Sequence, residues 1–276
     1  MMAANSRSLL ITDRFGRRLA QVAQRLKLEL DGRWSLDPGD FDGSYDLWRR
    51  VAVNMITAAQ RHNLHLASGY LAAFSASETG RRTPPPTFDA DEYVGMSRDG
   101  KPLTEALDRP LIDAKRAMSD GKDVATASST ARATALRSAQ MDAYHAARGP
   151  VAGHLQVSGQ AKGWRRVVVG ETCGACLAAA DGRIMPPSAG LKIHPGCDCV
   201  AEPVLSGVEE RFYRPDGKQI FESQPLAVQD ESLGSTTASL VREGEIDLAD
   251  LFSEVTTEGG NTFIKQRPIS ELIGAE

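Results

Sequence analysis

The sequence contains no run of apolar residues long enough to cross a bilayer. Its longest wholly apolar stretches cover only a few residues, whereas a spanning helix needs roughly 20. Residues 1–30 also lack the continuous apolar core of a signal peptide, because arginines interrupt the apolar positions. We therefore expect a soluble protein, made in a reducing cytoplasm, with no membrane partner.

Motifs of the common catalytic sites are absent too. No histidine is followed by glutamate at the second position, as in the zinc deaminases, and the His-Glu-x-x-His element of the zincins is missing. No serine lies in a Gly-x-Ser-x-Gly elbow, and no glycine-rich phosphate loop of the Walker or dinucleotide type is present. The sequence therefore predicts no catalytic residue, no organic cofactor and no small-molecule substrate, and it favours a protein that is not an enzyme.

The chain has no excess of positive charge. Its formal net charge is −4 and its pI is near 5.8, whereas a dedicated nucleic-acid-binding domain is usually clearly basic. The charge is uneven, because residues 221–276 hold eleven acidic and three basic residues, a net of −8, which leaves +4 for residues 1–220. We expect an acidic tail behind a mildly basic body.

Apolar residues recur at helical spacing through the first third of the chain. A stripe with spacings of four, three, four and four predicts a helix over about 7–30, which Asp31-Gly32 stops. A second stripe predicts a helix from about 44 to 74, antiparallel to the first. Prolines 84–86 then mark a long irregular loop. Residues 1–102 are therefore predicted to form a helical region with a Pro-rich loop.

The middle of the chain changes from helix to strand. Helical signals over 103–118 precede an alanine-rich helix over 122–148, which Gly149-Pro150 is expected to end. The sequence Trp-Arg-Arg-Val-Val-Val at 164–169 predicts the first strand. Residues 103–205 are thus predicted to combine a helix with a small β-containing module.

Turn signals divide the rest of the chain. Asp181-Gly182 predicts a hairpin turn, and residues 211–221 predict a β-hairpin that turns at Pro215-Asp216-Gly217. Residues 246–252 predict a helix, and the polar runs elsewhere in 206–276 predict an extended, partly ordered tail. The predicted fold class is α+β: an N-terminal antiparallel helical region, a small β-containing module with a Cys/His knuckle, and a partly extended C-terminal tail.

All four cysteines of the chain fall in one window. Cys173-Gly-Ala-Cys176 is followed by His194-Pro-Gly-Cys197-Asp-Cys199. Two thiols three residues apart on a tight turn grip one metal ion, and a second knuckle with histidine and cysteine closes a tetrahedron around it. The sequence therefore offers five candidate metal ligands, one more than a structural zinc site needs.

The choice of ligands stays open at this point. Cys173, Cys176 and Cys197 are the first choices, and either His194 or Cys199 completes the set. Residues two apart in an extended segment point to opposite faces, so Cys197 and Cys199 share a metal only where the chain turns between them, and this favours His194. The alternative is that the cysteines are reduced, or paired in disulfides that staple a hairpin, for instance 173 with 199 and 176 with 197. A reducing compartment favours metal, and we expect structural zinc.

The other histidines have simpler interpretations. His62 and His65 lie three residues apart on a predicted helix, and we expect them at the surface rather than on a metal. His145 and His154 flank the expected end of the alanine-rich helix, where a positive charge suits the helix dipole.

Several elements follow one another in a specific order. They are a helix with Arg132, Arg137 and Ala-Tyr144-His-Ala-Ala, a strand with Trp164, then Glu171-Thr172-Cys173-Gly-Ala-Cys176, Ala180-Asp181-Gly182 and His194-Pro195-Gly196-Cys197-Asp198-Cys199. This order and spacing resemble the Mu F-like minor head protein family of tailed bacteriophages. The resemblance covers about residues 125–205. Members of that family often carry arginine before the last cysteine, whereas this chain has Asp198, which puts a phosphate contact at that position in doubt.

The resemblance implies a structural Cys/His knuckle and no active site. It also implies a minor capsid protein of the virion, made in the bacterial host cytoplasm and present in few copies. Such a protein associates with the portal vertex or the capsid interior during head morphogenesis. The partners it implies are the portal protein, the major capsid protein or both.

Two other classes of function stay open. One is an enzyme, a capsid-maturation hydrolase or a toxin-like domain, because related head proteins are sometimes fused to such activities; no catalytic constellation in the chain supports it. The other is a zinc module that weakly contacts packaged DNA. Four basic residues around the knuckle give it modest support: Arg165, Arg166, Arg183 and Lys192.

Overall fold

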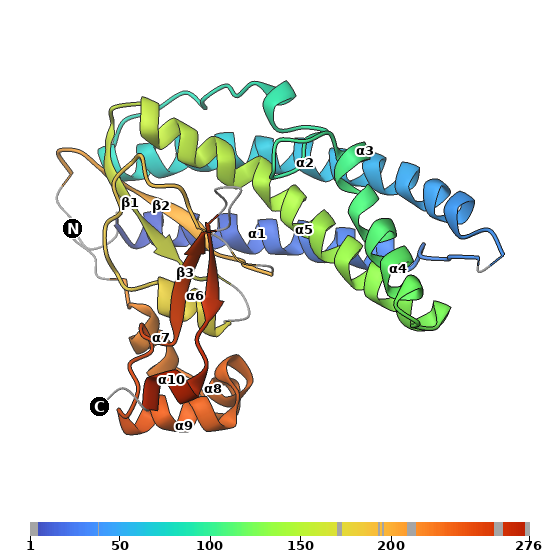
Figure 1. Cartoon of the computed structure of the whole chain (residues 1–276). Helices are drawn as coiled ribbons and strands as arrows, with labels where there is room; N and C mark the ends of the chain where they lie inside the picture. The colour runs from blue at the N-terminus through green and yellow to red at the C-terminus, as the bar shows by residue number, and fades with distance from the viewer. Residues whose placement is uncertain are drawn as a thin grey trace. The chain divides into compact units, whose positions relative to one another are not determined.

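The fold is mostly helical. The computed structural model describes residues 5–37, 39–169, 173–192, 194, 196–208, 214–256 and 262–273. Within these residues, two antiparallel two-stranded sheets accompany the helices (Figure 1). The α+β class predicted from the sequence is confirmed.

The elements follow one another along the whole chain. In order they are α1 (Asn5–Asp31), α2 (Phe41–Thr79), the 3-10 helix η1 (Ala90–Glu92), α3 (Leu103–Ala106), α4 (Asp108–Ser119), α5 (Val124–Val157), β1 (Ala161–Val167), α6 (Gly174–Ala179), β2 (Val200–Leu205), α7 (Gly217–Ser223), α8 (Leu226–Leu233), α9 (Ser235–Glu243), β3 (Phe252–Thr256), β4 (Thr262–Gln266) and α10 (Ile269–Ile273).

The chain divides into two compact units whose sequence segments alternate. A helical unit comprises Arg18–Leu71 and Pro85–Val151, and a mixed unit comprises Met1–Arg17, Ala72–Pro84 and Ala152–Glu276. Helices α1, α2 and α5 each contribute residues to both units. The units therefore do not begin or end at 102 and 205, the boundaries that the sequence predicts.

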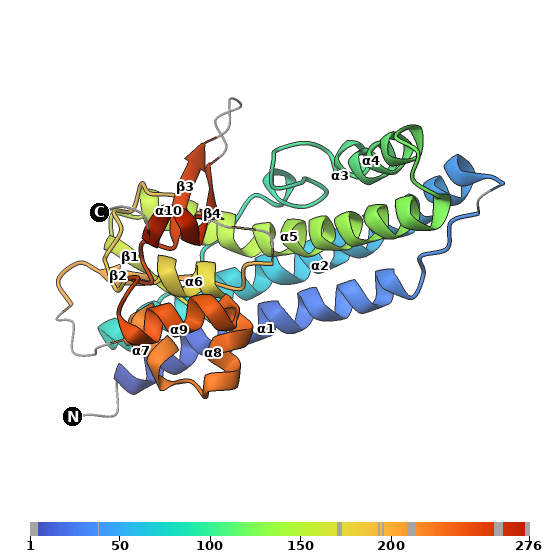
Figure 2. The ribbon, with the colours of Figure 1, turned by 60° about the horizontal axis from the view of Figure 1, so that its bottom comes forward.

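The helical unit is built from the long helices α1, α2 and α5. Helices α1 and α2 run antiparallel, and α5 lies alongside them in both ribbon views (Figures 1 and 2). Trp34, Tyr45 and Trp48 fill one end of the core, where the rings of Trp34 and Trp48 meet edge to face at 4.7 Å between centroids. Buried alanines such as Ala52 and Ala139 let the helices approach closely. The two predicted N-terminal helices are confirmed.

Buried polar side chains hold the loop that follows η1. The Oε1 of Gln60 accepts a hydrogen bond from Gly95 N at 2.8 Å, and its Nε2 donates to the carbonyl of Met96 at 2.7 Å. The Oδ1 of Asp142 accepts from Arg98 N at 3.1 Å. These contacts satisfy backbone groups of an irregular segment that has no strand partner over most of its length. The loop predicted in this region is thereby fixed to α2 and α5.

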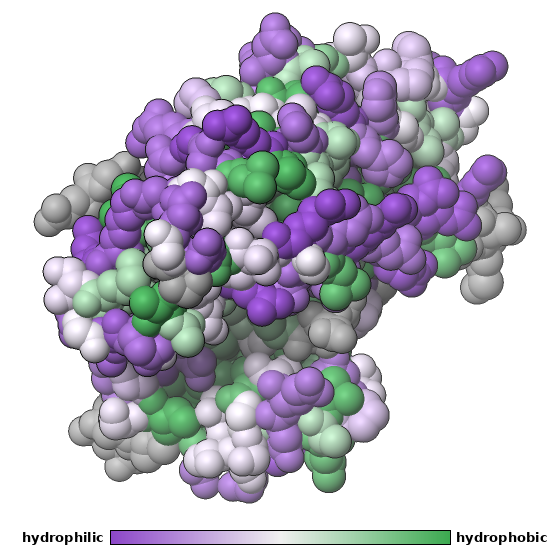
Figure 3. All heavy atoms as spheres, turned by 90° about the vertical axis from the view of Figure 1, so that its right-hand side faces the viewer, coloured by the Kyte–Doolittle hydropathy of each residue, from purple (hydrophilic) through white to green (hydrophobic). Residues whose placement is uncertain are grey.

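The surface carries its apolar groups in small patches. On the side drawn in Figure 3, most side chains are hydrophilic and the apolar ones form separate groups between them. The exposed large apolar residues of the helical unit, Leu28, Leu47, Ile112 and Val124, lie on four different helices. Within the described part of the chain, no helix is both long and apolar enough to span a bilayer.

Gly149-Pro150 does not end α5, contrary to the prediction. The helix continues to Val157 with Pro150 inside it, although proline removes one backbone donor and usually kinks or ends a helix. The glycine has a packing role, because a Cβ at this position would come 2.7 Å from the ring of Tyr93. A glycine that permits close packing and a glycine that ends a helix look the same in the sequence.

In the mixed unit, β1 and β2 form an antiparallel pair. The register runs from Val167 opposite Val200 to Ala161 opposite Leu205. Every residue of β2 is buried, so both faces of this strand are covered by the rest of the unit. The strand predicted over 164–169 is confirmed, although β1 begins and ends earlier in the chain.

The C-terminal part folds around a core of its own, and the prediction of an extended tail is wrong there. Helices α7, α8 and α9 pack against α6, with Phe221 and Leu251 fully buried between them. Helices α7, α8 and α9 span only seven to nine residues each, which is too short for a periodic stripe to stand out in the sequence. Their apolar residues form one core because these short helices converge. Gly259-Gly260-Asn261, expected in the tail, lie outside the described residues.

The β-hairpin predicted over 211–221 is wrong in its described part. Asp216, expected in a turn, caps α7: its Oδ1 accepts from Gln219 N at 2.9 Å, and the Gln219 side chain accepts from Asp216 N at 3.1 Å. Residues 211–213 lie outside the described part of the chain. The helix predicted over 246–252 is also wrong, since that segment forms turns that lead into β3.

Candidate metal centre

The first two cysteines are positioned by the start of α6. Cys173 is the N-cap of this helix, and its Sγ accepts a hydrogen bond from Cys176 N at 3.4 Å. A residue at N3 of a helix lies above its N-cap, so the spacing Cys-x-x-Cys brings both sulfurs to the same end of α6. Gly174 between them is required by packing, because a Cβ there would come 2.2 Å from the Leu233 side chain.

The other three candidates come from the segment that precedes β2. Cys197 N donates to the carbonyl of His194 at 3.1 Å, which closes a tight turn. Gly196 within this turn has a φ of +81°, a left-handed conformation that glycine adopts without strain. Cys199 follows directly before Val200, the first residue of β2. Glu171, Thr172 and Pro195, which belong to the family resemblance, lie outside the described residues.

The turn at Asp181-Gly182 lies between these two segments. Asp181 Oδ1 accepts from Arg183 N at 3.0 Å, and Gly182 has a φ of +75°. The expected turn therefore forms, but the chain after it is irregular and makes only an isolated bridge between Trp164 and Met185. The two cysteine segments are brought together by the β1–β2 pairing and by α6 rather than by a hairpin.

The five donor atoms form two triplets that share Cys176. One triplet is Cys173, Cys176 and His194, and the other is Cys176, Cys197 and Cys199; within each, all donor atoms lie within 4.8 Å of one another. Cys197 and Cys199 thus lie close together, which from sequence required the chain to turn between them. Within the described part of the chain, no other His, Cys, Asp or Glu side chains form such a group.

The separations suit a tetrahedral metal site. The Nε2 of His194 lies 3.2 Å from the Cys173 sulfur and 3.1 Å from the Cys176 sulfur, and the Cys176 and Cys197 sulfurs are 3.9 Å apart. Zinc bonds of about 2.3 Å to sulfur and about 2.0 Å to nitrogen give tetrahedral edges of about 3.8 Å between sulfurs and about 3.6 Å between sulfur and nitrogen. Shifts of a few tenths of an ångström bring these atoms to such edges, so the cluster could hold a metal ion.

Cys197 is better placed than Cys199 to complete the first triplet. The imidazole of His194 interacts with Cys197 as well as with Cys173, and Cys197 also faces Cys176. The described contacts of Cys199 within the cluster are with Cys176 and Cys197. The contact of Cys197 with both His194 and Cys176 therefore favours Cys173, Cys176, His194 and Cys197 as the four ligands.

Neighbouring donors strongly perturb the protonation of Cys173 and His194. The hydrogen bond with Cys176, reinforced by His194, outweighs burial and lowers the pKa of the Cys173 thiol to about 4. Burial by itself would lower the pKa of His194, but the hydrogen bonds with Cys173 and Cys197 outweigh it and raise that pKa to about 10. Without a metal, the cluster thus contains a thiolate paired with an imidazolium, and a metal ion must displace that proton.

The thiols of Cys176 and Cys199 are driven towards their neutral forms. The hydrogen bond with Cys173 raises the pKa of Cys176. Cys176 lowers the pKa of Cys199, but Cys197 and burial outweigh it and raise the value to about 12. A low-dielectric cluster cannot accumulate several negative sulfurs unless a cation balances them.

None of the four cysteines is in a disulfide. Cys176, Cys197 and Cys199 are buried, with 3%, 0% and 0% of their surface exposed. The pairing of 173 with 199 and 176 with 197, the alternative considered from sequence, is therefore absent from this structure.

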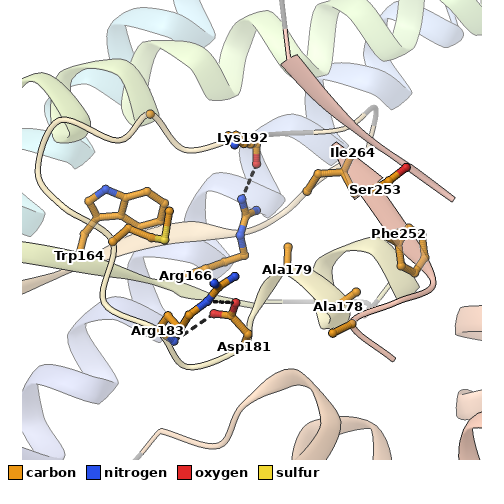
Figure 4. Close-up of a pocket in the computed structure, with 13 residues that line it drawn as sticks. Trp164, Arg166, Ala178, Ala179, Asp181, Arg183, Lys192, Phe252, Ser253 and Ile264 are labelled. Carbon is orange, nitrogen blue, oxygen red and sulfur yellow. Dashed lines mark hydrogen bonds and ion pairs between the residues drawn. The ribbon is translucent and has the colours of Figure 1, made fainter. Parts of the chain in front are cut away.

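A cavity of about 240 Å³ lies in the mixed unit and shares Arg166 with the surroundings of the cluster. Figure 4 shows the Arg166 guanidinium directed at the backbone carbonyl of Lys192, to which its Nη2 donates. On the same view Arg183 pairs with Asp181. Trp164 lines one side of the cavity and Phe252 the other.

The basic residues considered for DNA contact are mostly engaged within the protein. Arg166 and Arg183 have the partners just described, and Arg165 lies 3.9 Å from Glu202 in an ion pair. These intramolecular contacts weaken the argument for a phosphate-binding surface. Arg166 instead belongs to the surroundings of the cluster, a role that its alternation with Val168 along the extended chain could have indicated.

The other histidines lie away from the cluster. His62 and His65 are exposed, as expected. His145 is not at a helix end, because α5 continues well past it. Burial lowers the pKa of His145 and of His154, so the expectation of a positive charge at the end of this helix is not supported at either position.

No protein-family model matches the chain, and no curated protein or solved structure was found that is significantly similar to it. The resemblance to the Mu F-like family therefore rests on the quoted residues alone.

Proposed function

We propose that this chain is a non-enzymatic assembly protein whose Cys/His cluster is a structural zinc clasp. The observation that carries the clasp is that Cys173, Cys176 and His194 place their donor atoms within 4.8 Å of one another, while the Cys197 sulfur lies 3.9 Å from that of Cys176. The wider role, a minor capsid protein in tailed-phage head morphogenesis, is supported by the order of motifs over residues 125–205.

Zinc is the metal that suits these donors best. Thiolates together with an imidazole nitrogen form the usual donor set of structural zinc sites. Hard cations such as Mg²⁺ and Ca²⁺ prefer oxygen ligands, and the described donor triplets contain only sulfur and nitrogen. The sulfurs of Cys176 and Cys197 are buried, so a metal held there would have little access to water or substrate. A closed site of this kind has a structural role rather than a catalytic one.

The clasp would join two segments that have few apolar residues of their own. It would tie the first turn of α6 to the turn that leads into β2, and so hold α6 beside the β1–β2 pair. Among the residues that the structure describes, Val168 is the one partly buried apolar neighbour of the cysteine cluster besides Cys173. Small modules with little core commonly depend on a metal for their stability.

The assembly role makes the portal protein, the major capsid protein or both the expected partners, and the virion head the expected location. Two features support an assembly role over catalysis. The described cavity beside the cluster is lined by arginines already paired within the chain, and the sequence contains none of the common catalytic motifs considered above.

The test is to tag this protein in a phage that encodes it and to purify complete heads on a density gradient. We expect the tagged chain to co-sediment with heads, to be present in a few copies per head, and to co-purify with portal or capsid protein. A chain that is abundant in infected cells yet absent from heads and from assembly intermediates would refute the assembly role. Zinc content, measured on the same purified protein, tests the clasp independently.

A further inference from the structure

Arg166 is a charged residue that contacts the cluster without being one of its donors. It lies on β1 opposite Ala201 of β2, two residues before Val168, which packs against the cysteines. Residues two apart on an extended chain share a face. The side chain of Arg166 is therefore directed to the same side of the strand as the metal centre.

Arg166 holds the segment that carries His194. Its Nη2 donates a hydrogen bond to the carbonyl oxygen of Lys192 (Figure 4), and Lys192 precedes His194 by two residues. Hydrogen bonds from a charged donor are about twice as strong as neutral ones. This contact fixes the backbone immediately before the only nitrogen ligand of the proposed site.

The rest of the guanidinium faces the sulfurs. The guanidinium makes a side-chain hydrogen bond with Cys199 and lies close to Cys197 and Cys176. The Nη1 of Arg166 is buried and has no hydrogen-bond partner among the described residues. A buried donor without a partner is costly, so this N–H is available to a sulfur that becomes a thiolate when metal binds.

We propose that Arg166 is the positioning residue and counter-ion of the metal centre, holding the His194 segment through Lys192 and balancing the thiolates with its charge. The inference rests on the zinc binding proposed above. Three thiolates, a neutral imidazole and Zn²⁺ leave one negative charge in excess, and a single guanidinium neutralises it. Without that cation, an uncompensated charge would have to be buried, which is strongly unfavourable.

Three substitutions separate the charge of Arg166 from its hydrogen bonds. Arg166→Lys keeps the charge, Arg166→Gln keeps a hydrogen-bond donor without the charge, and Arg166→Met keeps neither. We expect Arg166→Gln and Arg166→Met to weaken zinc binding by roughly 10- to 100-fold, the range typical of residues that support metal ligands. Arg166→Lys should weaken zinc binding by less than about tenfold, because it keeps the positive charge.

Affinity is measured with zinc alone, in competition with a chromophoric chelator, on the full-length reduced protein. Binding of Co²⁺ gives a second readout, because its absorption spectrum reports how many sulfurs coordinate the metal. Arg183→Met is the matched control. It removes a positive charge from the same cavity wall, but its side chain is 78% exposed and pairs with Asp181, so zinc affinity should stay within about twofold of the wild type.

The outcomes are distinct. Arg166→Gln with wild-type affinity, or Arg166→Lys no better than Arg166→Met, would show that the charge is not used and would overturn the inference while leaving the zinc clasp intact. Wild-type protein that binds no zinc would overturn the clasp and the inference together. If Arg166→Met does not fold, as judged by circular dichroism, the zinc affinities of Arg166→Lys and Arg166→Gln still show whether the charge is needed.

Discussion

At the residue scale, Cys176 has the widest consequence because it belongs to both donor triplets. Its sulfur contacts His194 on one side and Cys197 on the other. Any four-ligand site drawn from the cluster must use it. Cys173 and Cys199, in contrast, each belong to one triplet only.

Substitution of single cysteines should therefore give unequal losses of metal. Cys176→Ser should abolish zinc binding, and Cys173→Ser should reduce it to background, because a structural site needs four donors. Cys199→Ser should still bind one zinc per chain, since Cys199 lies outside the favoured set. Elemental analysis of reduced, gel-filtered protein measures this directly. Loss of zinc in Cys199→Ser with retention in Cys173→Ser would reverse the assignment of ligands.

A second residue with a measurable signature is Asp142, a carboxylate in the core of the helical unit. Its side chain is 2% exposed, and its Oδ1 lies 3.3 Å from the guanidinium of Arg98. Burial raises the pKa of Asp142 to about 6, with Arg98 opposing the shift and Asp99 adding to it. The folded protein thus holds a proton on Asp142 at pH values where the unfolded chain has released it.

The free energy of unfolding should therefore fall as the pH rises from about 4 to about 6, by up to about 3 kcal/mol from this group. Asp142→Asn lacks the titrating group, so its stability relative to the wild type should improve over that interval and then level off. Urea unfolding at pH 4, 5, 6 and 7 measures the difference. Ser97→Ala, which loses a loop hydrogen bond to Lys101 N and keeps Asp142, should differ from the wild type by a constant amount. A constant difference for Asp142→Asn would contradict the prediction.

At the scale of elements, Arg214 connects the beginning of α1 to β2 within the mixed unit. Its guanidinium makes a bidentate contact with Glu202 on β2, at 2.6 Å for the shortest pair, and reaches Asp13 on α1 at 3.0 Å. It also donates to the carbonyl of Leu9 at 3.1 Å. Glu202 is 4% exposed, so its charge depends on these partners.

Removing Arg214 should be costly because it leaves Glu202 buried with only the more distant Arg165. Arg214→Met should lower the free energy of unfolding by about 3 kcal/mol. The double variant Arg214→Met with Glu202→Leu should recover much of that loss, since replacing a buried ion pair by apolar side chains is often neutral. Urea denaturation of the zinc-loaded proteins measures both. A double variant no more stable than the single one would contradict this account.

At the scale of the whole molecule, the metal centre and the aromatic core belong to different compact units. The cluster lies in the mixed unit, and the core around Tyr45 and Trp48 lies in the helical unit. A ligand stabilises the structure to which it binds by mass action, by about 2.7 kcal/mol when its free concentration is 100 times its dissociation constant. The stabilisation by zinc should therefore be regional.

Removing zinc with a strong chelator should increase hydrogen exchange in α6 and in β1 and β2. The segments of α2 and α5 that pack in the helical unit should keep their protection. Hydrogen-exchange mass spectrometry before and after chelation gives both readings, and the zinc-free Cys176→Ser variant is the control for effects of the chelator itself. An equal increase in both units would show that the metal stabilises the molecule as a single body.

Much of the local structure followed from the sequence by itself, for identifiable reasons. The long helices α1 and α2 were predictable because their apolar residues repeat at helical spacing. The second half of β1 was predictable from Trp164 and the valines at 167–169, whereas its start at Ala161 was not. The five donors were identifiable because cysteine occurs nowhere else in the chain, and a Cys-x-x-Cys pair meets at a helix start by local geometry alone.

Other features depended on contacts between residues far apart in the sequence. Gly149 permits close packing on Tyr93 rather than ending a helix, and Asp216 caps a helix rather than turning a hairpin; the local sequence allows either. The packing of β1, β2 and α6 also brings Cys197 and Cys199 close to Cys176. It likewise directs Arg166 towards the carbonyl of Lys192. The sequence alone determined which side chains could bind a metal. Only the tertiary structure decided which of them meet, because distance and burial arise from packing rather than from spacing along the chain.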